Sequence, residues 1–517
     1  MKTSAKLFFI ITTVGIFLML GYYFAKPFWV KKIQISSSDA GQAEATLTIG
    51  VDSWAGYLPL CSGEMRKRLL SKGLLLQCEN DNGNYAERMQ KLYQGKLDFA
   101  VATVDSYILN AAQYDFPGSI IMVIDESKGG DAIVALKDKI SKLDQLKTKQ
   151  GWKIAFTPAS PSEHLLKSIS SHFDLQAIRN KKGAWRVEVS GSEEARKRLE
   201  AGEVDLAVLW EPDISKVLAS EKMVKLIGTE DTRRLIVDIL VVNRKLAKDH
   251  PEWVKKLLME YFNVLKFFRD NPQSLVEEIR SQSKISEEQA LQVLQGVRFV
   301  NLTENARDWF GIPVNGQGKD GLVSTIESTV EILLEHHDFK QSPLPERDPY
   351  RLQYRTFVEE LVSDLTQFGN TSEQLPSGSG GGFPPLTPEQ WEALMEIGTL
   401  RIRPIPFKSG TMELDENGEA ELDLLVQNQL YHYPNFRILV TGHTGSRGDR
   451  LANQELSLQR AEAVKKYLLE KHNLDTNRIH CLGMGSERPL PQDPGESERS
   501  FEYRLPRVEL KLLAPTI

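Results

Sequence analysis

Acidic side chains stand at the ends of several short apolar segments in the first half of the chain. In a sheet of parallel strands, ligands bind outside the carboxyl ends of the strands, so these acids are expected to face one cleft. A group of carboxylates favours an amine-bearing or zwitterionic solute over an anion. The alternative is that some of them are solvated or cap helices. The four acids are Asp105, Asp131, Glu211 and Asp238.

Aromatic and hydroxyl side chains accompany these acids. Trp54 and Tyr57 follow the apolar segment 47–52 and are able to stack on a flat or cationic part of a ligand, or else to pack between lobes. Ser160 and Ser162 precede an expected helix over 163–172. They are placed to present backbone N–H groups to a carboxylate or phosphate, or simply to cap the helix.

Two cysteines are expected to lie near one another. Cys61 comes shortly after the first expected strand, and Cys78 ends the second, which would lie beside the first in a parallel sheet. Outside the cytoplasm the two are able to form a disulfide, and the alternative is a pair of buried free thiols. Cys481, within an expected strand, is interpreted as a free core cysteine.

The spacing of three residues near the C-terminus puts one cation in a defined place. Asn453, Leu456 and Arg460 lie at i, i+3 and i+7 and so share one helix face. Arg460 is therefore expected to point at the loop that follows the strand 436–442.

No pattern of catalysis is found. The nine histidines show no HExxH or other metal spacing, and the three cysteines lack CxxC spacing. GxSxG, Walker A and GxGxxG motifs are absent from the sequence. The sequence predicts neither an enzyme, nor a metal site, nor a cofactor.

These residues need an α/β framework to position them. Strand-like and helix-like segments alternate from residue 46 to about 344, which is typical of a domain with parallel strands, and one more helix is expected over 348–368. Residues 369–385 are rich in Gly, Ser and Pro and are predicted to be a flexible linker. A smaller α+β domain follows, with a helix expected over 388–398 and strands over 399–407, 436–442, 478–484 and 507–512.

The N-terminus indicates the compartment. Residues 7–24 form an uncharged apolar run of 18 residues, long enough at about 1.5 Å per residue to cross most of a bilayer. We expect an uncleaved membrane anchor within residues 1–32, with a cleaved signal peptide as the alternative, and a short tether over 33–46. Lys26, Lys31 and Lys32 outnumber Lys2 and Lys6, which by charge alone favours the opposite topology. The resemblances of the downstream domains, described below, lead us to expect an inner-membrane protein with its bulk in the periplasm.

The overall charge argues against nucleic acid as a partner. Lys plus Arg number 64 and Asp plus Glu 70, a net charge of −6. The chain carries no basic stripe with interleaved aromatic residues, so we expect no nucleic-acid binding.

The first domain resembles the type II periplasmic solute-binding proteins of ABC importers, in the nitrate, sulfonate and thiamine-precursor branch. The matching stretches include GVDSWAGYLPL, KLYQGKLDFAVAT, EEARKRLEAGEVDLAVLWEPD and DILVVNRKLAKDHPEWVKKLL. The resemblance implies two lobes over residues 47–345, one of about 47–140 and 236–340 and one of about 145–235, that close on a solute. The cleft residues it implies are Trp54, Gly56, Tyr57, Asp105, Ser106, Gly130, Asp131, Ser160, Ser162, Glu211 and Asp238.

The last domain, residues 386–517, resembles the OmpA-like peptidoglycan-associated domain. The motif lies in FRILVTGHTGSRGDRLANQELSLQRAEAVKKYLLEKHNLDTNRIHCLGMGSERP, residues 436–489. The resemblance implies that a loop Asp and a helix Arg bind the diaminopimelate of wall peptides. Here Gly445 stands at the Asp position, so wall binding is expected to be weakened; Asp449 is the nearest acid in the loop. The binding residues implied are Thr444, Asn453, Arg460 and Arg507.

The expected whole is an α/β bilobal periplasmic-binding-protein fold of type II and a C-terminal α+β OmpA-like sandwich, behind one N-terminal transmembrane helix. Its expected function is membrane-tethered capture of a solute next to the cell wall, with an ABC permease and peptidoglycan as partners. The alternative is a structural or sensory envelope protein whose solute-binding domain is degenerate and serves protein interaction.

Overall fold

The computed structural model describes residues 43–314, 316–367, 383–408, 411–493 and 495–515. The expected membrane anchor at 7–24 and most of the expected linker at 369–385 lie outside these residues. Within the described ranges, no helix combines the length and the apolar character needed to cross a membrane.

The first sheet contains six strands in the order β11-β4-β10-β3-β1-β2. β1 is parallel to β2 and β3, as expected, but β10 is antiparallel to both β3 and β4. The expectation of a parallel sheet was therefore wrong for this strand. The chain returns from the second sheet beside the carboxyl ends of β3 and β4, so β10 begins where those two strands end. The strands are β1 (Ala45–Val51), β2 (Leu74–Asn80), β3 (Phe99–Thr103), β4 (Gly118–Ser127), β10 (Val237–Asn243) and β11 (Val297–Phe299).

The second sheet contains five strands in the order β7-β6-β8-β5-β9. Here β5 is antiparallel to β8 and β9. The chain thus leaves the first sheet after Ser127 and enters the second at Asp131, so the expected lobe border near residue 140 was wrong. We call residues 43–127 and 237–367 the first lobe, 131–228 the second lobe, and 128–130 and 229–236 the two crossovers. The strands are β5 (Asp131–Leu136), β6 (Ile154–Phe156), β7 (Arg186–Glu188), β8 (Leu206–Trp210) and β9 (Met223–Gly228).

Helices cover both sheets, and their starts follow local capping. Asn84 caps α4 and Thr103 caps α5 in a reciprocal capping box with Ser106. The expected helix over 348–368 begins only at Thr356, after a 3₁₀ turn at Pro349–Leu352. The α-helices of the two lobes are α2 (Leu58–Cys61), α3 (Gly63–Ser71), α4 (Tyr85–Tyr93), α5 (Val104–Ala111), α6 (Gln145–Thr148), α7 (Pro161–His172), α8 (Ser192–Glu200), α9 (Asp213–Leu218), α10 (Arg244–Asp249), α11 (Pro251–Asp270), α12 (Pro272–Ser283), α13 (Glu287–Gln295), α14 (Leu302–Glu304), α15 (Gly321–Glu335) and α16 (Thr356–Gln367).

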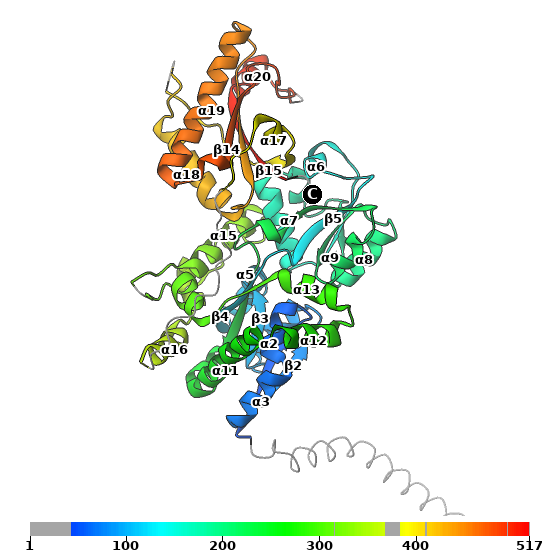
Figure 1. Ribbon diagram of the computed structural model, residues 1–517, viewed down its shortest axis with the longest axis vertical. Coiled ribbons are helices and arrows are strands. Elements are labelled where there is room, and N and C mark those ends of the chain that lie inside the picture. Colours follow the sequence, from blue (N-terminus) through cyan, green and yellow to red (C-terminus); the bar gives the residue numbers. More distant parts are fainter. Residues whose placement is uncertain (1–42, 315, 368–382, 409–410, 494, 516–517) are drawn as a thin grey trace, which may run out of the picture.

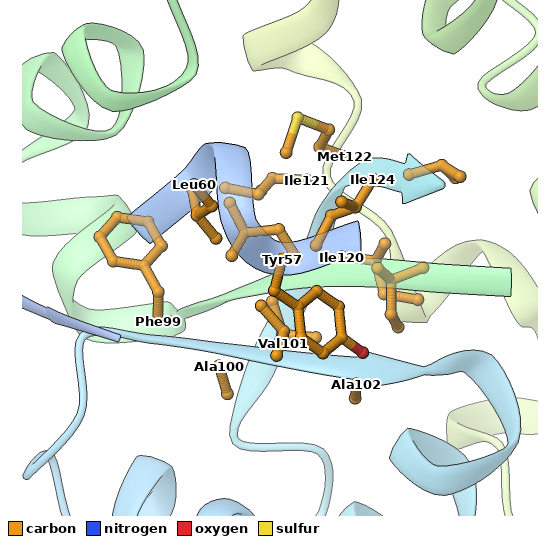
Figure 2. Packing of buried hydrophobic residues seen from close by; sticks show 14 of the residues in the cluster. Tyr57, Leu60, Phe99, Ala100, Val101, Ala102, Ile120, Ile121, Met122 and Ile124 are labelled. Carbon is orange, nitrogen blue, oxygen red and sulfur yellow. The ribbon is translucent and has the colours of Figure 1, made fainter. Parts of the chain in front are cut away.

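The core of the first lobe lies between its sheet and the helices on either face. β3 and β4 are buried along their whole length, and residues 120–124 give β4 an unbroken apolar run of the kind found in central strands. Tyr57 lies between the short helical segment around Leu60 and strand β3, close to Ala102 (Figure 2). Its aromatic ring therefore belongs to the core, while its hydroxyl group is left for a polar partner.

The C-terminal domain, residues 383–515, is built on a four-stranded sheet in the order β12-β15-β13-β14. Its first strand is β12 (Met395–Thr399), so the expected helix over 388–398 and strand over 399–407 were wrong. The helix α17 stops at Glu392, and the following residues pair with β15. The other elements are α17 (Pro388–Glu392), α18 (Glu416–Asn428), β13 (Arg437–His443), α19 (Arg450–His472), β14 (Ile479–Gly483), α20 (Glu498–Arg504) and β15 (Arg507–Ala514).

The C-terminal domain packs against the second lobe and one crossover (Figure 1). In the crossover, the Arg233 N–H donates to the His432 carbonyl (2.8 Å), and His432 Nδ1 bonds the Arg233 carbonyl (2.8 Å). On the second lobe, His172 Nδ1 hydrogen-bonds the buried Tyr433 hydroxyl (2.8 Å). Residues of both domains belong to one continuous apolar cluster, so the interface is closely packed.

Cys61 and Cys78 form a disulfide in the structure, with Cα atoms 6.2 Å apart. The bond links α2 to β2 across a separation of 17 residues. Cys481 is a free cysteine whose thiol faces the Ala461 carbonyl.

Reduction of this disulfide should lower the free energy of unfolding by about 3 kcal/mol, because the unfolded chain gains the entropy of an open loop. Urea unfolding with and without dithiothreitol measures the difference. Cys481→Ser is the control and should show the same effect of reductant, whereas the double variant Cys61→Ser/Cys78→Ser should show none. An equal effect of reductant on all three proteins would contradict the assignment.

Candidate functional site

A small enclosed cavity lies between the two lobes, where the edges of their sheets face each other. It encloses about 30 Å³, and both lobes and one crossover contribute to its walls. Since a water needs roughly 10–15 Å³ of such space, the cleft is nearly closed in this conformation. The lining residues are Asp52, Trp54, Tyr57, Gly83, Tyr85, Thr103, Asp131, Thr157, Ser160, Pro161, Trp210, Ile236 and Asp238.

The charged groups of this lining are all carboxylates. Asp131 comes from the start of β5 in the second lobe, whereas Asp52 and Asp238 come from the first. Burial raises the pKa of Asp131 to about 7, partly offset by a hydrogen bond from Ser127. Asp131 makes no ion pair with a residue that the structure describes. A cation in the cleft would give the Asp131 carboxylate the positively charged partner that it lacks among the described residues.

Asp238, in the cavity lining, and Asp125, which is outside the lining, form a second pair of acids. The Tyr57 hydroxyl donates to Asp238 Oδ1, and Trp54 Nε1 donates to Asp125 Oδ1 (3.1 Å). Burial raises the pKa of Asp125 to about 7 and raises that of Asp238 well above its ordinary value, and the charge of Asp125 adds to the rise for Asp238. The two aromatic side chains hold the two carboxyl groups in place through these hydrogen bonds.

Asp52 differs from Asp131 because it has a cationic partner. The fully buried Arg88 donates to Asp52 Oδ2 (3.1 Å), to Asp81 and to the Val101 carbonyl (2.8 Å). Its two acidic partners raise the pKa of Arg88 further above its ordinary value. Asp52 is thus paired with a cation, whereas Asp131 and Asp238 line the cavity without one among the described residues.

Two glycines make room for the indole of Trp54. A Cβ atom at Gly130 would lie 2.1 Å from Trp54 Cη2, and one at Gly56 would lie 2.0 Å from Asp125 Oδ2. Neither position tolerates a side chain without displacing Trp54 or its carboxylate partner.

The structure brings together about half of the cleft residues expected from the sequence. Trp54, Tyr57, Asp131, Ser160 and Asp238 line the cavity, and Gly56 and Gly130 pack behind Trp54. Ser160 is also the N-cap of α7 and accepts from the Ser162 N–H (3.2 Å).

Besides these two glycines, four expected cleft residues lie outside the lining. Ser106 belongs to the capping box of α5, and Asp105 is buried in the first turn of that helix, where burial raises its pKa to about 7. Glu211 accepts from Ser215 at the start of α9 (2.8 Å), and Ser162 is buried within α7. For these residues the alternative of helix capping or internal packing describes the structure better.

Sequence reasoning missed several lining residues and the groups behind them. Asp52 and Trp210 stood in stretches already singled out, beside Trp54 and Glu211, and their position at a strand end was an available signal. Asp125 had the same signal, because it stands near the end of the apolar segment 119–125. Tyr85 and Arg88 had none, because only the packing of α4 against β3 carries them to the cleft.

The C-terminal domain holds a second group of expected site residues around the loop between β13 and α19. The Thr444 N–H donates to the Gly485 carbonyl (2.8 Å), and Asn453 donates to the Arg447 carbonyl (3.0 Å). Arg460 lies over the ring of Phe407, 5.2 Å from its centroid. Arg507 is instead paired with Glu509 (2.7 Å).

Asp449 does not replace the acid missing at Gly445. Its carboxylate caps α19 and accepts from the Ala452 N–H (2.9 Å). Within the described ranges, no cluster of three or more His, Cys, Asp or Glu side chains has the geometry to hold a metal ion.

Comparisons with known proteins agree with this division of the chain. A family model described as NMT1/THI5 like matches residues 71–274, and a model described as OmpA family matches residues 406–502. The peptidoglycan-associated lipoprotein of Rhizobium meliloti is 30% identical over 135 residues, which is 25% of this chain and 73% of that protein. The carboxyl-terminal part of the chain belongs to the OmpA family.

Other relatives of the OmpA domain are larger proteins. Outer membrane protein Omp38 of Acinetobacter baumannii is 29% identical over 121 residues, 23% of this chain and 33% of that protein. Outer membrane porin F of Pseudomonas aeruginosa is 29% identical over 101 residues, 20% of this chain and 29% of that protein. The chain thus spans about a third of the length of these curated relatives.

Several solved structures are similar to part of this chain. The periplasmic aliphatic sulphonate-binding protein from Escherichia coli has a TM-score of 0.46 and 14% identity, covering 60% of this chain and 99% of that one. The nitrate-binding protein from Synechocystis has a TM-score of 0.47 and 12% identity, covering 65% and 92%. A desulfurization enzyme has a TM-score of 0.43 and 12% identity, covering 62% and 100%. The two family models show an NMT1/THI5-like domain and an OmpA domain in this chain, as the sequence predicted.

Replacing Gly130 by Ala should lower the free energy of unfolding by about 1–3 kcal/mol, because the new methyl group overlaps Trp54 and the Gly296 carbonyl oxygen. Urea unfolding of the full chain measures this change. Gly63→Ala is the matched control, since a Cβ there meets no atom within 4 Å. Equal stability of the two variants would show that Trp54 is not held as described.

Proposed function

We propose that the protein captures a small amine-bearing or zwitterionic solute between its two lobes while its OmpA domain associates with peptidoglycan. The observation that carries the first part is the lining of the cleft, in which Asp131 has no cationic partner among the described residues. Trp54, Tyr85 and Trp210 add aromatic surface of the kind that binds organic cations.

The electrostatics of the cleft support a cation over an anion. An anion entering here would meet Asp131 and Asp238 without a lining Arg or Lys to compensate. An ammonium group instead lowers the energy of the ionised Asp131 and displaces its proton. A carboxylate on the same solute would find hydroxyl donors at Thr103, Thr157 and Ser160.

Capture would proceed by closure of the lobes about the two crossovers. Residues 128–130 and 229–236 are the segments that join the two sheets, and the cavity lies between those sheets. The volume of about 30 Å³ is too small for an organic solute, so entry requires the lobes to separate.

The OmpA domain supports the second part of the proposal. Its relative from Rhizobium meliloti is named a peptidoglycan-associated lipoprotein. We infer association with the wall, with the bulk of the chain in the periplasm and residues 7–24 as an inner-membrane anchor. Delivery of the solute to an ABC permease completes this interpretation.

A second candidate is a structural or sensory envelope protein whose lobes serve as an interaction domain. The nearly closed cavity and the packed interface between the second lobe and Tyr433 favour it. The two candidates differ in whether a small molecule stabilises the lobes.

A thermal-shift screen of the full chain in detergent should give a hit among amino acids, polyamines or quaternary amines. At 100 times its dissociation constant a ligand adds about 2.7 kcal/mol to the free energy of unfolding, a shift of a few degrees. A hit only among nitrate, alkanesulfonates or phosphate would contradict the cation preference. Silence across the panel would favour the structural or sensory candidate.

The affinity for the amine found in that screen should increase about tenfold from pH 6 to pH 8. The free Asp131 carboxyl has a pKa of about 7, so at low pH the ligand must displace a proton and at high pH it need not. Calorimetric titrations at pH 6, 7 and 8 measure the change. Asp131→Asn should bind more weakly and lose this dependence. The control is Asp205→Asn, because Asp205 precedes β8 at the end of that strand remote from Asp131. An unchanged pH profile in Asp131→Asn would contradict the role of Asp131.

Wall association should depend on Arg460. Co-sedimentation of the full chain in detergent with purified sacculi should fall by about tenfold or more in Arg460→Ala, because a wall-peptide carboxylate loses its guanidinium. Arg403→Ala, an exposed arginine of the same domain, is the control. Equal sedimentation of the two variants would indicate that any binding is non-specific.

A further inference from the structure

A carboxylate from a distant part of the OmpA domain lies against the loop at Gly445. Glu502, on α20, places Oε2 3.8 Å from the position that a Cβ atom at Gly445 would occupy. The Ser446 hydroxyl donates to Glu502 Oε1 (2.7 Å) and holds the carboxylate in this place. The loop therefore lacks an acid of its own at residue 445 but has one beside it.

Glu502 makes no ion pair with any residue that the structure describes, although it stands in a charged neighbourhood. On the same helix Arg504 pairs with Glu496 (2.6 Å), and nearby Arg507 pairs with Glu509 (2.7 Å). These pairings leave the neutral Ser446 as the hydrogen-bond partner of the Glu502 carboxylate among the described residues. Its second oxygen is available to a cationic group.

Arg460, in the same domain, is a cation that has no acidic partner among the described residues. Its guanidinium makes no ion pair within the described residues, and its buried Nε atom has no hydrogen-bond acceptor there. The contact with the ring of Phe407, 5.2 Å away, supports the guanidinium from one side and leaves its donors for another group. Burial without a carboxylate partner lowers the pKa of Arg460 from its ordinary value.

A short hydrogen-bonded chain ties the helix that carries Arg460 to the loop beside Glu502. Ser457 Oγ accepts from the Gly485 N–H (2.9 Å), and the Gly485 carbonyl accepts from the Thr444 N–H (2.8 Å). Arg460 lies three residues after Ser457, and helical side chains lean toward the helix N-terminus, so it leans toward the loop. The Thr444 hydroxyl, in a side chain only 6% exposed, has no partner in the described structure.

We propose that Glu502 and Arg460 together form a binding site for a zwitterionic amino-acid group, in which Glu502 binds the ammonium and Arg460 binds the carboxylate. The Thr444 hydroxyl, which has no partner among the described residues, supplies a further donor from the same loop. This inference rests on the proposed wall association and names its ligand class, the free amino-acid end of a wall peptide. It assigns to α20 the acidic function that Gly445 cannot provide.

The test uses the full chain in detergent, with purified sacculi and with meso-diaminopimelate as the soluble probe. Glu502→Gln should reduce co-sedimentation and the affinity for the probe by about tenfold, because it removes the charge and keeps the size. Glu498→Gln, at the first residue of α20 and four residues before Glu502, is a matched control on the same helix and should bind as the unchanged protein does. Ser446→Ala should weaken binding less than Glu502→Gln.

The decisive variant restores an acid within the loop. Gly445→Asp in the Glu502→Gln background should recover most of the lost affinity, since it returns one carboxylate to the same place. In the unchanged background Gly445→Asp should give little gain, because two carboxylates about 4 Å apart repel each other. Thermal unfolding of each variant checks that the domain remains folded.

The outcomes separate the inference from the function on which it rests. Binding by the unchanged protein that is lost in Arg460→Ala but kept in Glu502→Gln would overturn the role of Glu502 and leave wall association standing. Equal losses in Glu502→Gln and Glu498→Gln would also overturn it. Absence of binding by the unchanged protein would overturn both the proposed wall association and the inference.

Discussion

The buried guanidinium of Arg88 is the constraint on which the first lobe and its cleft depend. Its side chain is fully enclosed, and its donors reach Asp52 after β1, Asp81 after β2 and the Val101 carbonyl in β3. A charge at this depth is tolerated only because each donor has an acceptor. The ends of the three parallel strands are thereby held together, and one wall of the cleft is fixed before any ligand enters.

Two acids that line the cleft differ in whether they have a cationic partner. Asp52 is neutralised by Arg88, whereas Asp131, brought from the other lobe, is buried without a cation and has a raised pKa. The same contrast recurs in the OmpA domain, where most charged residues around α20 are paired but Arg460 and Glu502 are not. Leaving a half-buried charge unpaired costs free energy, and a ligand of opposite charge recovers it.

The interface between the domains places the OmpA domain in contact with a crossover next to the cleft. His432 forms two hydrogen bonds with Arg233, which belongs to a crossover between the lobes. Tyr433 and His172 extend the contact onto the second lobe. Because the shared core is apolar and continuous, the OmpA domain and the second lobe form one packed body in this structure.

The sequence by itself determined the two-lobed α/β domain, the OmpA domain and the place of Trp54 and Tyr57 directly after the first strand, because these depend on local patterns of apolar, turn and capping residues. Asp131 and Asp238 were expected at carboxyl ends of strands but stand at the beginnings of β5 and β10. The sequence did not determine the antiparallel β10, the crossover at 128–130 or the strand β12, since strand direction and pairing depend on contacts between distant segments. Nor could it show that Arg88 neutralises Asp52 or that Glu502 lies beside Gly445. Those pairings join residues 36 and 57 positions apart, and only the packed tertiary structure brings such side chains within a few ångströms.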